Sequence, residues 1–188
     1  MELPDFRLDT VDAYNKIFGL PTHHPLVSVV NLREATAIPG NMRYHYGVYA
    51  LFLKNDTNCT LKYGRRNYDY QEGTVTSFAP GQTIDVEMKD TDKAPDALGV
   101  LFHPDLIFGT TLGERISSFS FFDYSQTEAV HLSLEERNIF IDHSRQNHRV
   151  LEYCGIKLID ILFPELCNIC AVQPYCSFGW LLHSHHQL

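Results

Sequence analysis

The chain has 188 residues, of which 44% are hydrophobic and 12% aromatic, a composition typical of one packed globular core rather than two large independent domains. It contains no run of about 18 apolar residues, so we expect no membrane-spanning helix and no membrane partner. The formal net charge of −8 opposes direct contact with nucleic acid, because phosphate binding needs a basic face. The N-terminus lacks the basic and apolar regions of a signal peptide, which predicts a cytoplasmic protein.

The first 25 residues predict an N-terminal arm that contains one short helix. A weak helical period runs through residues 10–18, and Gly19 ends it. Two strands are expected next. Residues 26–32 are rich in valine, and residues 44–53 form a run of aromatic and aliphatic residues that is apolar on both faces. The second run predicts a single central strand.

Residues 59–82 read as consecutive short strands separated by turns. Glycine, with or without a polar or proline neighbour, marks each turn: Gly64, Glu72-Gly73 and Pro80-Gly81. Two more strands are expected, an alternating one at 83–88 and a buried one at 99–102. This series predicts a small antiparallel barrel, an architecture that binds ligands in its mouth.

After Pro104 the pattern changes to helices. Helical turns are expected at 105–108 and 110–116, and Ser133 with Glu136 forms a capping box that starts a longer helix. A further helix is predicted from about residue 147 to 162. One stripe of this helix is apolar and is predicted as a dimer contact, although the same spacing also fits a core: Leu151, Cys154, Leu158 and Leu162.

Candidate ligand-binding residues come from the predicted barrel. Arg43, His45 and Tyr49 would share one face of the central strand and converge in the mouth, where arginine can pair with a carboxylate or with sugar hydroxyls. The full set of predicted pocket residues is Arg43, His45, Tyr49, Tyr63 and Phe78. No serine-nucleophile elbow, phosphate-binding glycine loop or His-Glu-x-x-His motif is present, so no catalytic residue is predicted.

Residues 166–188 form an atypical tail rich in cysteine and histidine. Its possible metal ligands are Cys167, Cys170, Cys176, His183, His185 and His186. Cys-x-x-Cys spacing lets two thiolates bind one zinc ion, but a second paired ligand set at ordinary spacing is missing. A zinc site and an atypical tail both remain open, and the prediction is no metal and no cofactor.

Six segments together resemble the N-terminal domain of AraC-type transcription regulators. They are YGVYALFLK at 46–54, LKYG at 61–64, YDYQEGT at 68–74, FAPGQ at 78–82, LFHPDL at 101–106 and the aromatic run at 119–124. The resemblance covers roughly residues 8–150. It implies a cupin-like barrel that senses a small molecule, then helices that dimerise, then two DNA-binding helix-turn-helix units.

The sequence departs from that pattern in two ways. It stops before the helix-turn-helix units, and its tail beyond about residue 151 is unlike the family's continuation, so we expect a truncation or a change of reading frame. It also lacks the metal ligands of catalytic cupins. Gly47 stands two residues after His45, and Gln82, Thr83 and Ile84 follow Pro80-Gly81 where a histidine would be needed.

The prediction is therefore a mainly β protein with C-terminal helices (α+β), divided into an arm at 1–25, a cupin-like effector-binding barrel at 26–125, a helical dimerisation segment at 130–165 and the tail at 166–188. It would bind an unknown small effector, such as a sugar or small carboxylate, and form a homodimer without touching nucleic acid itself. The alternatives are a metal-dependent cupin enzyme, of the sugar isomerase or dioxygenase type, and a stand-alone binding module.

Overall fold

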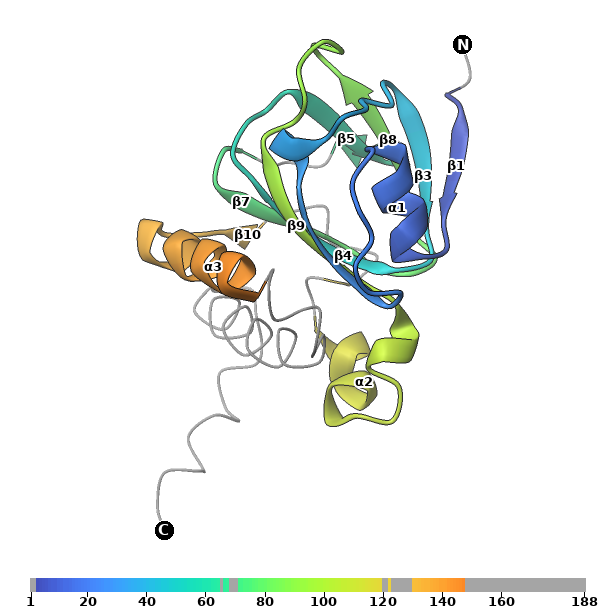
Figure 1. Ribbon diagram of the computed structural model, residues 1–188, viewed down its shortest axis with the longest axis vertical. Helices are drawn as coiled ribbons and strands as arrows, with labels where there is room; N and C mark the ends of the chain where they lie inside the picture. The colour runs from blue at the N-terminus through green and yellow to red at the C-terminus, as the bar shows by residue number, and fades with distance from the viewer. Residues whose placement is uncertain (1–2, 65, 68–70, 120–121, 123–129, 148–188) are drawn as a thin grey trace.

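The computed structural model describes residues 3–64, 66–67, 71–119, 122 and 130–147. Its described strands form two five-stranded sheets that face each other (Figure 1). The first sheet has the order β1 (Asp5–Leu8), β3 (Met42–Tyr46), β8 (Thr83–Met88), β5 (Cys59–Tyr63) and β6 (Arg66–Asn67). The second has the order β10 (Val130–His131), β7 (Thr74–Phe78), β4 (Tyr49–Lys54), β9 (Ala97–Phe102) and β2 (Val27–Asn31).

Strand pairing is antiparallel throughout, except that β1 runs parallel to β3. The mainly β class predicted from the sequence is confirmed. The described strands do not, however, close into one hydrogen-bonded barrel, because each sheet keeps its own two edges.

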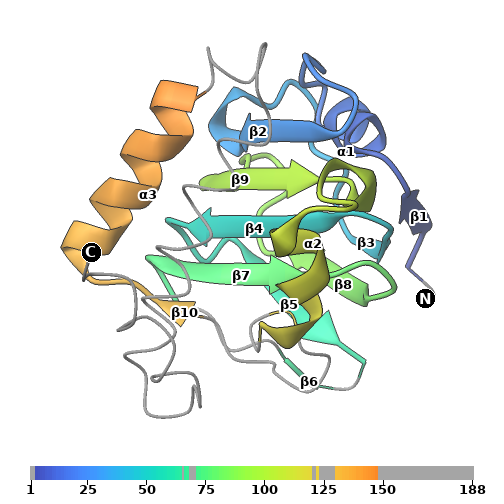
Figure 2. The same cartoon turned by 90° about the horizontal axis from the view of Figure 1, so that it is seen from below.

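The described helices are short, apart from one. They are α1 (Val11–Ile17), α2 (Thr111–Arg115) and α3 (Leu134–Asn147), with 3-10 turns η1 (Leu32–Glu34), η2 (Pro104–Leu106) and η3 (Ile116–Ser118). Helix α1 contacts β1 and β2 and adds side chains to the space between the sheets. Helices α2 and α3 lie over the other face of the second sheet (Figure 2).

The alternation of β-strand side chains gives the second sheet two buried faces. On β4, Ala50 and Phe52 point into a core shared with the first sheet and α1, whereas Leu51 and Leu53 point into a second core. That second core is completed by residues after β9, among them Leu106, Ile116 and Phe140. This double burial explains why the sequence of β4 is apolar on both faces.

The single strand predicted for residues 44–53 is wrong, because the structure divides it between the sheets. Strand β3 ends at Tyr46 in the first sheet and β4 begins at Tyr49 in the second. At the corner, the Gly47 amide donates to the Leu8 carbonyl at 3.0 Å, and a Cβ on Gly47 would stand 2.9 Å from the Asp9 Cα. Backbone this close leaves room only for glycine.

Within the turn-rich run 59–82, the structure has β5, β6 and β7, and β8 follows directly, while residues 65 and 68–70 of the run lie outside the described part. Gly64, Gly73 and Gly81 have φ values of +59°, +77° and +89°, the left-handed region that the predicted turns require. The β9 strand also agrees with the sequence, although it starts two residues earlier, at Ala97.

The N-terminal arm differs most from expectation. The helix predicted at 10–18 is confirmed as α1, whose first turn is capped by the Thr10 hydroxyl accepting from the Ala13 amide at 3.1 Å. Strand β1 was missed, since four residues without clear alternation give little signal. Leu8 and Val11 are fully buried, so the segment is part of the main core.

Two further sequence predictions concern helices. The Ser133 and Glu136 capping box is present at the start of α3, and the predicted turn at 110–116 contains α2. The predicted helix at 147–162 lies outside the described residues, apart from Asn147. No helix in the described part of the chain is long and apolar enough to cross a lipid bilayer.

Candidate functional site

A pocket lies between the two sheets at the end where α1 packs. Its empty space measures about 480 Å³, with its opening to solvent included. The walls combine apolar side chains with a few polar ones, a mixture typical of small-molecule sites. The polar side chains in the lining are Tyr14, Tyr44, Tyr46, Lys54 and Cys59.

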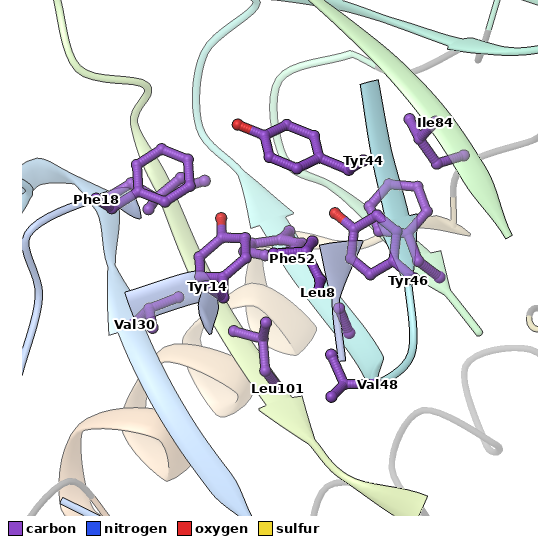
Figure 3. Packing of buried hydrophobic residues seen from close by; sticks show 14 of the residues in the cluster. Leu8, Tyr14, Phe18, Val30, Tyr44, Tyr46, Val48, Phe52, Ile84 and Leu101 are labelled. Atoms are coloured by element: carbon purple, nitrogen blue, oxygen red, sulfur yellow. The ribbon is translucent and has the colours of Figure 1, made fainter. Parts of the chain in front are cut away.

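The three pocket tyrosines come from β3 and α1. On β3, Tyr44 and Tyr46 point inward while Arg43 and His45 point outward, as period-two geometry requires. Tyr14 reaches the same space from α1, stacking on Phe18 with ring centroids 4.8 Å apart. Figure 3 shows the three hydroxyl oxygens turned toward one region between the sheets.

The three tyrosine residues are buried, with exposures of 3% for Tyr14, 4% for Tyr44 and 6% for Tyr46. Their hydroxyl groups line the pocket and make no hydrogen bond with another described residue. Burial raises the pKa of each phenol above its ordinary value, and the neighbouring tyrosines and Cys59 raise the pKa of Tyr14 further. All three therefore stay protonated and can donate.

Lys54 brings a positive charge to the same pocket. It is the last residue of β4 and follows Ala50 and Phe52 on the inward face, with 7% of its surface exposed. Its Nζ lies 4.0 Å from the Cys59 Sγ and 5.4 Å from the centroid of the Phe52 ring. The pocket thus presents an ammonium group and three hydroxyls within apolar walls.

Arg43 and His45, both predicted for the pocket, lie on the outer face of the first sheet. The Arg43 guanidinium donates two hydrogen bonds to Asp85, at 2.6 and 2.9 Å, and lowers the pKa of that carboxyl against the opposing effect of partial burial. The His45 ring contacts the Thr83 hydroxyl at 2.9 Å and the Asp5 carboxylate at 3.1 Å. These contacts join β1, β3 and β8 across the sheet.

Tyr49 does not share a strand face with Arg43 and His45, and that expectation is wrong. It starts β4 in the second sheet, where its ring stacks on Phe102 and meets Phe122 edge-on, both with centroids 5.0 Å away. This places Tyr49 in the core under the helices. The cause is the corner at Gly47, which moves the chain from one sheet to the other.

The two remaining predicted residues lie nearer the pocket. Phe78 lines it, is 2% exposed and stacks on Tyr46 with centroids 4.8 Å apart. Tyr63 is part-buried and packs against the same core, but it is not among the lining residues. The predicted dimer residues Leu151, Cys154, Leu158 and Leu162, like the cysteines and histidines of the tail, lie outside the described residues.

Phe78 is the one predicted residue in the described lining, and sequence reasoning missed all five of its polar side chains: Tyr14, Tyr44, Tyr46, Lys54 and Cys59. Tyr14 lies in the segment that was interpreted as an N-terminal arm. Tyr44 and Tyr46 alternate along β3 with Arg43 and His45, which were predicted for the pocket in their place. Lys54 did carry a signal. A lysine in phase with the inward positions 50 and 52 of an apolar strand is unusual, because lysine is rarely buried.

A second hollow lies beside α3 and the outer edge of the second sheet, lined by Arg33, Asn55, Asp96 and Leu98 among others. Its charged groups satisfy each other. The Arg33 guanidinium pairs with the Asp96 carboxylate, which also accepts from the Asn55 amide at 3.1 Å. The pocket between the sheets is therefore the better candidate for binding a ligand.

Among the described residues, no group of three or more His, Cys, Asp or Glu side chains is arranged to hold a metal ion. None of the described residues that line the pocket is a histidine, an aspartate or a glutamate.

No protein-family model matches the chain, and no curated protein matches it at a significant level.

Proposed function

We propose that this chain is a small-molecule sensor with a cupin-like arrangement of its two sheets, equivalent to the effector-binding domain of an AraC-type transcription regulator. One observation carries the proposal: three tyrosine hydroxyls that bond no described residue line one pocket between the sheets, together with Lys54 and Cys59. Hydroxyl groups that line a pocket and make no bond within the described fold can donate to, and accept from, the polar atoms of a ligand.

The position of the pocket would allow a bound ligand to change how the surrounding elements pack. Its walls come from α1, from both sheets and from the segment after η1, including Ile38 and Gly40. A ligand that contacts all of these elements stabilises their packing against one another. It thereby shifts the balance between conformations that differ in how they pack.

The lining chemistry favours binding over metal catalysis. A catalytic zinc or iron site needs about three nitrogen, sulfur or carboxylate ligands from the protein. The pocket offers phenols, one ammonium group and one thiol in place of histidines and carboxylates. Elemental analysis that found stoichiometric iron, manganese or nickel in the purified protein would instead support the enzyme alternative.

Under this proposal the protein acts in the cytoplasm as a homodimer through residues 130–165, and a separate DNA-binding segment reads the promoter. Native mass spectrometry tests the dimer directly. A monomer at micromolar concentration, with or without ligand, would support the alternative of a stand-alone binding module.

A thermal-shift screen of neutral sugars and small carboxylates tests the pocket. A ligand that binds only the folded state at 100 times its Kd adds about 2.7 kcal/mol to the free energy of unfolding and raises Tm. The hit should give a smaller shift with Tyr46→Phe, which removes one pocket hydroxyl. The matched control is Tyr49→Phe, on the opposite face of the second sheet, which should respond like the wild type.

Two results contradict the proposal. One is the absence of any hit across the screen, and the other is a hit whose shift is equally large in the wild type and Tyr46→Phe.

A further inference from the structure

The hollow beside α3 carries polar groups whose bonding capacity its own ion pair does not exhaust. It lies where β2 and β4 end and β9 begins, and its empty space measures about 850 Å³ with its opening to solvent included. Helix α3 runs past this end of the second sheet (Figure 2) and contributes Ile141 and Ser144 to the wall. No described residue lines both this hollow and the pocket between the sheets, so the inference is independent of the function proposed above.

The ion pair between Arg33 and Asp96 stands in the wall of the hollow. One oxygen of the Asp96 carboxylate accepts from the Arg33 guanidinium, and the other accepts from the Asn55 amide at 3.1 Å. The backbone amide of Asp96 also donates to the Asp56 carboxylate at 3.0 Å, which fixes the position of the pair. A carboxylate accepts at about four positions and a guanidinium has five N–H donors, so both groups can bond further atoms.

The described lining carries charges of both signs, namely Arg33 against the carboxylates of Glu34 and Asp96. A simple anion in the hollow would be repelled by the carboxylates, and a simple cation by the guanidinium. The described residues also offer no group of three His, Cys, Asp or Glu side chains arranged for a metal ion. A ligand that carries both charges avoids both repulsions.

The ion pair sets the spacing that those two ligand charges need. Arg33 and Asp96 are in direct contact, so a ligand complementary to both must hold its own cation and anion close together. An α-amino acid does so, because its ammonium and carboxylate groups are bonded to the same carbon. The Asp96 side chain is 20% exposed, so water screens its charge only in part.

The remaining wall is mainly apolar. Val29, Leu98 and Ile141 line the hollow and are only partly buried against the second core, so each keeps apolar surface that a ligand can cover. Ser144 adds a hydroxyl to the wall. It is fully buried and has no hydrogen-bond partner in the described part of the chain.

We infer that this hollow binds an α-amino acid with an aliphatic side chain. The carboxylate of the ligand pairs with the Arg33 guanidinium, and its ammonium group pairs with the Asp96 carboxylate. Its side chain packs on Val29, Leu98 and Ile141.

Isothermal titration calorimetry with L-leucine and L-valine tests this inference against analogues that lack one of the two charges. For leucine these are 4-methylpentanoate and 3-methylbutylamine, and for valine 3-methylbutanoate and 2-methylpropylamine. The wild type should bind at least one of the two amino acids. It should bind both analogues of that amino acid at least about tenfold more weakly, because a hydrogen bond to a charged group contributes a factor of ten or more.

Arg33→Gln removes the guanidinium charge and should weaken binding of the amino acid at least about tenfold. The matched control is Arg7→Gln, which removes an arginine from another largely exposed ion pair, with Asp9, at the first sheet. It should bind like the wild type. Circular dichroism melting of both variants shows that each is folded at the titration temperature.

Three results overturn the inference: no binding of either amino acid, equal affinity for an amino acid and one of its analogues, or undiminished binding by folded Arg33→Gln. Tyr46→Phe separates the two sites, because Tyr46 lines only the pocket between the sheets. Binding that is weakened by Tyr46→Phe and not by Arg33→Gln places the amino acid in that pocket, which overturns this assignment and supports the sensor function.

Discussion

Tyr14 and Asn15 are neighbours on α1, and both are buried, but their polar groups have different surroundings. The Asn15 amide donates to the Pro21 carbonyl at 3.2 Å and to the Ser28 hydroxyl at 3.0 Å, so it links α1 to the following loop and to β2. The Tyr14 hydroxyl faces the pocket and bonds no described residue. The Asn15 side chain therefore stabilises the fold, whereas the Tyr14 hydroxyl is available to a ligand in the pocket.

This difference predicts opposite effects of two substitutions on stability in the absence of ligand. Tyr14→Phe should leave the free energy of unfolding unchanged or raise it, because the hydroxyl that it removes bonds no described residue and the ring keeps its packing. Asn15→Ala should lower it by about 1–3 kcal/mol, since buried partners lose their hydrogen bonds. Urea unfolding measures both, and a clear loss of stability in Tyr14→Phe would contradict the assignment of its hydroxyl to the pocket.

Helix α3 begins with a reciprocal pair of side-chain contacts to the backbone. The Glu136 amide donates to the Ser133 hydroxyl at 3.3 Å, and the Ser133 amide donates to the Glu136 carboxylate at 2.6 Å. These bonds satisfy two amides that the helix itself leaves without partners. They fix the start of the element that brings Phe140 onto the second sheet.

Ser133→Ala should lower the stability of the protein by about 1 kcal/mol, the usual cost of removing a helix cap. Ser133→Asp is the control, because aspartate caps equally well and its charge suits a helix N-terminus. Hydrogen exchange of the first amides of α3 locates the effect. Equal exchange rates in the wild type and Ser133→Ala would show that the cap does not stabilise α3.

The second sheet separates two cores, and this arrangement decides which parts of the molecule a ligand can influence. Leu51 and Phe52 are adjacent on β4, and each is at most 2% exposed, but Leu51 packs under the helices while Phe52 lines the pocket. Stability depends on both faces of the sheet. Ligand size depends on the inner face alone.

Truncation on either side of the sheet should therefore give a similar loss of stability but different binding. Leu51→Ala should cost about 2–5 kcal/mol and Phe52→Ala about 3–5 kcal/mol. Phe52→Ala should also admit larger ligands, whereas folded Leu51→Ala should keep the wild-type preference. Calorimetric titration with ligands of increasing size checks this, and an altered preference in Leu51→Ala would contradict the separation of the cores.

Local signals in the sequence were sufficient for most elements. The turns at Gly64, Gly73 and Gly81 need a backbone conformation that glycine adopts readily, and the capping box needs only residues three apart. Such interactions join neighbours in the chain, so the sequence determines them. The mainly β class follows from the same local alternation.

Only the tertiary structure decided the pocket. The sequence showed that residues 44–53 favour β structure, but a corner imposed by contact between Gly47 and Leu8 divides them between two sheets. Once that corner is made, alternation turns Tyr44 and Tyr46 inward and Arg43 outward, and Tyr14 meets them from a segment about thirty residues earlier. The pocket depends on contacts between residues far apart in the chain, which local periodicity does not record.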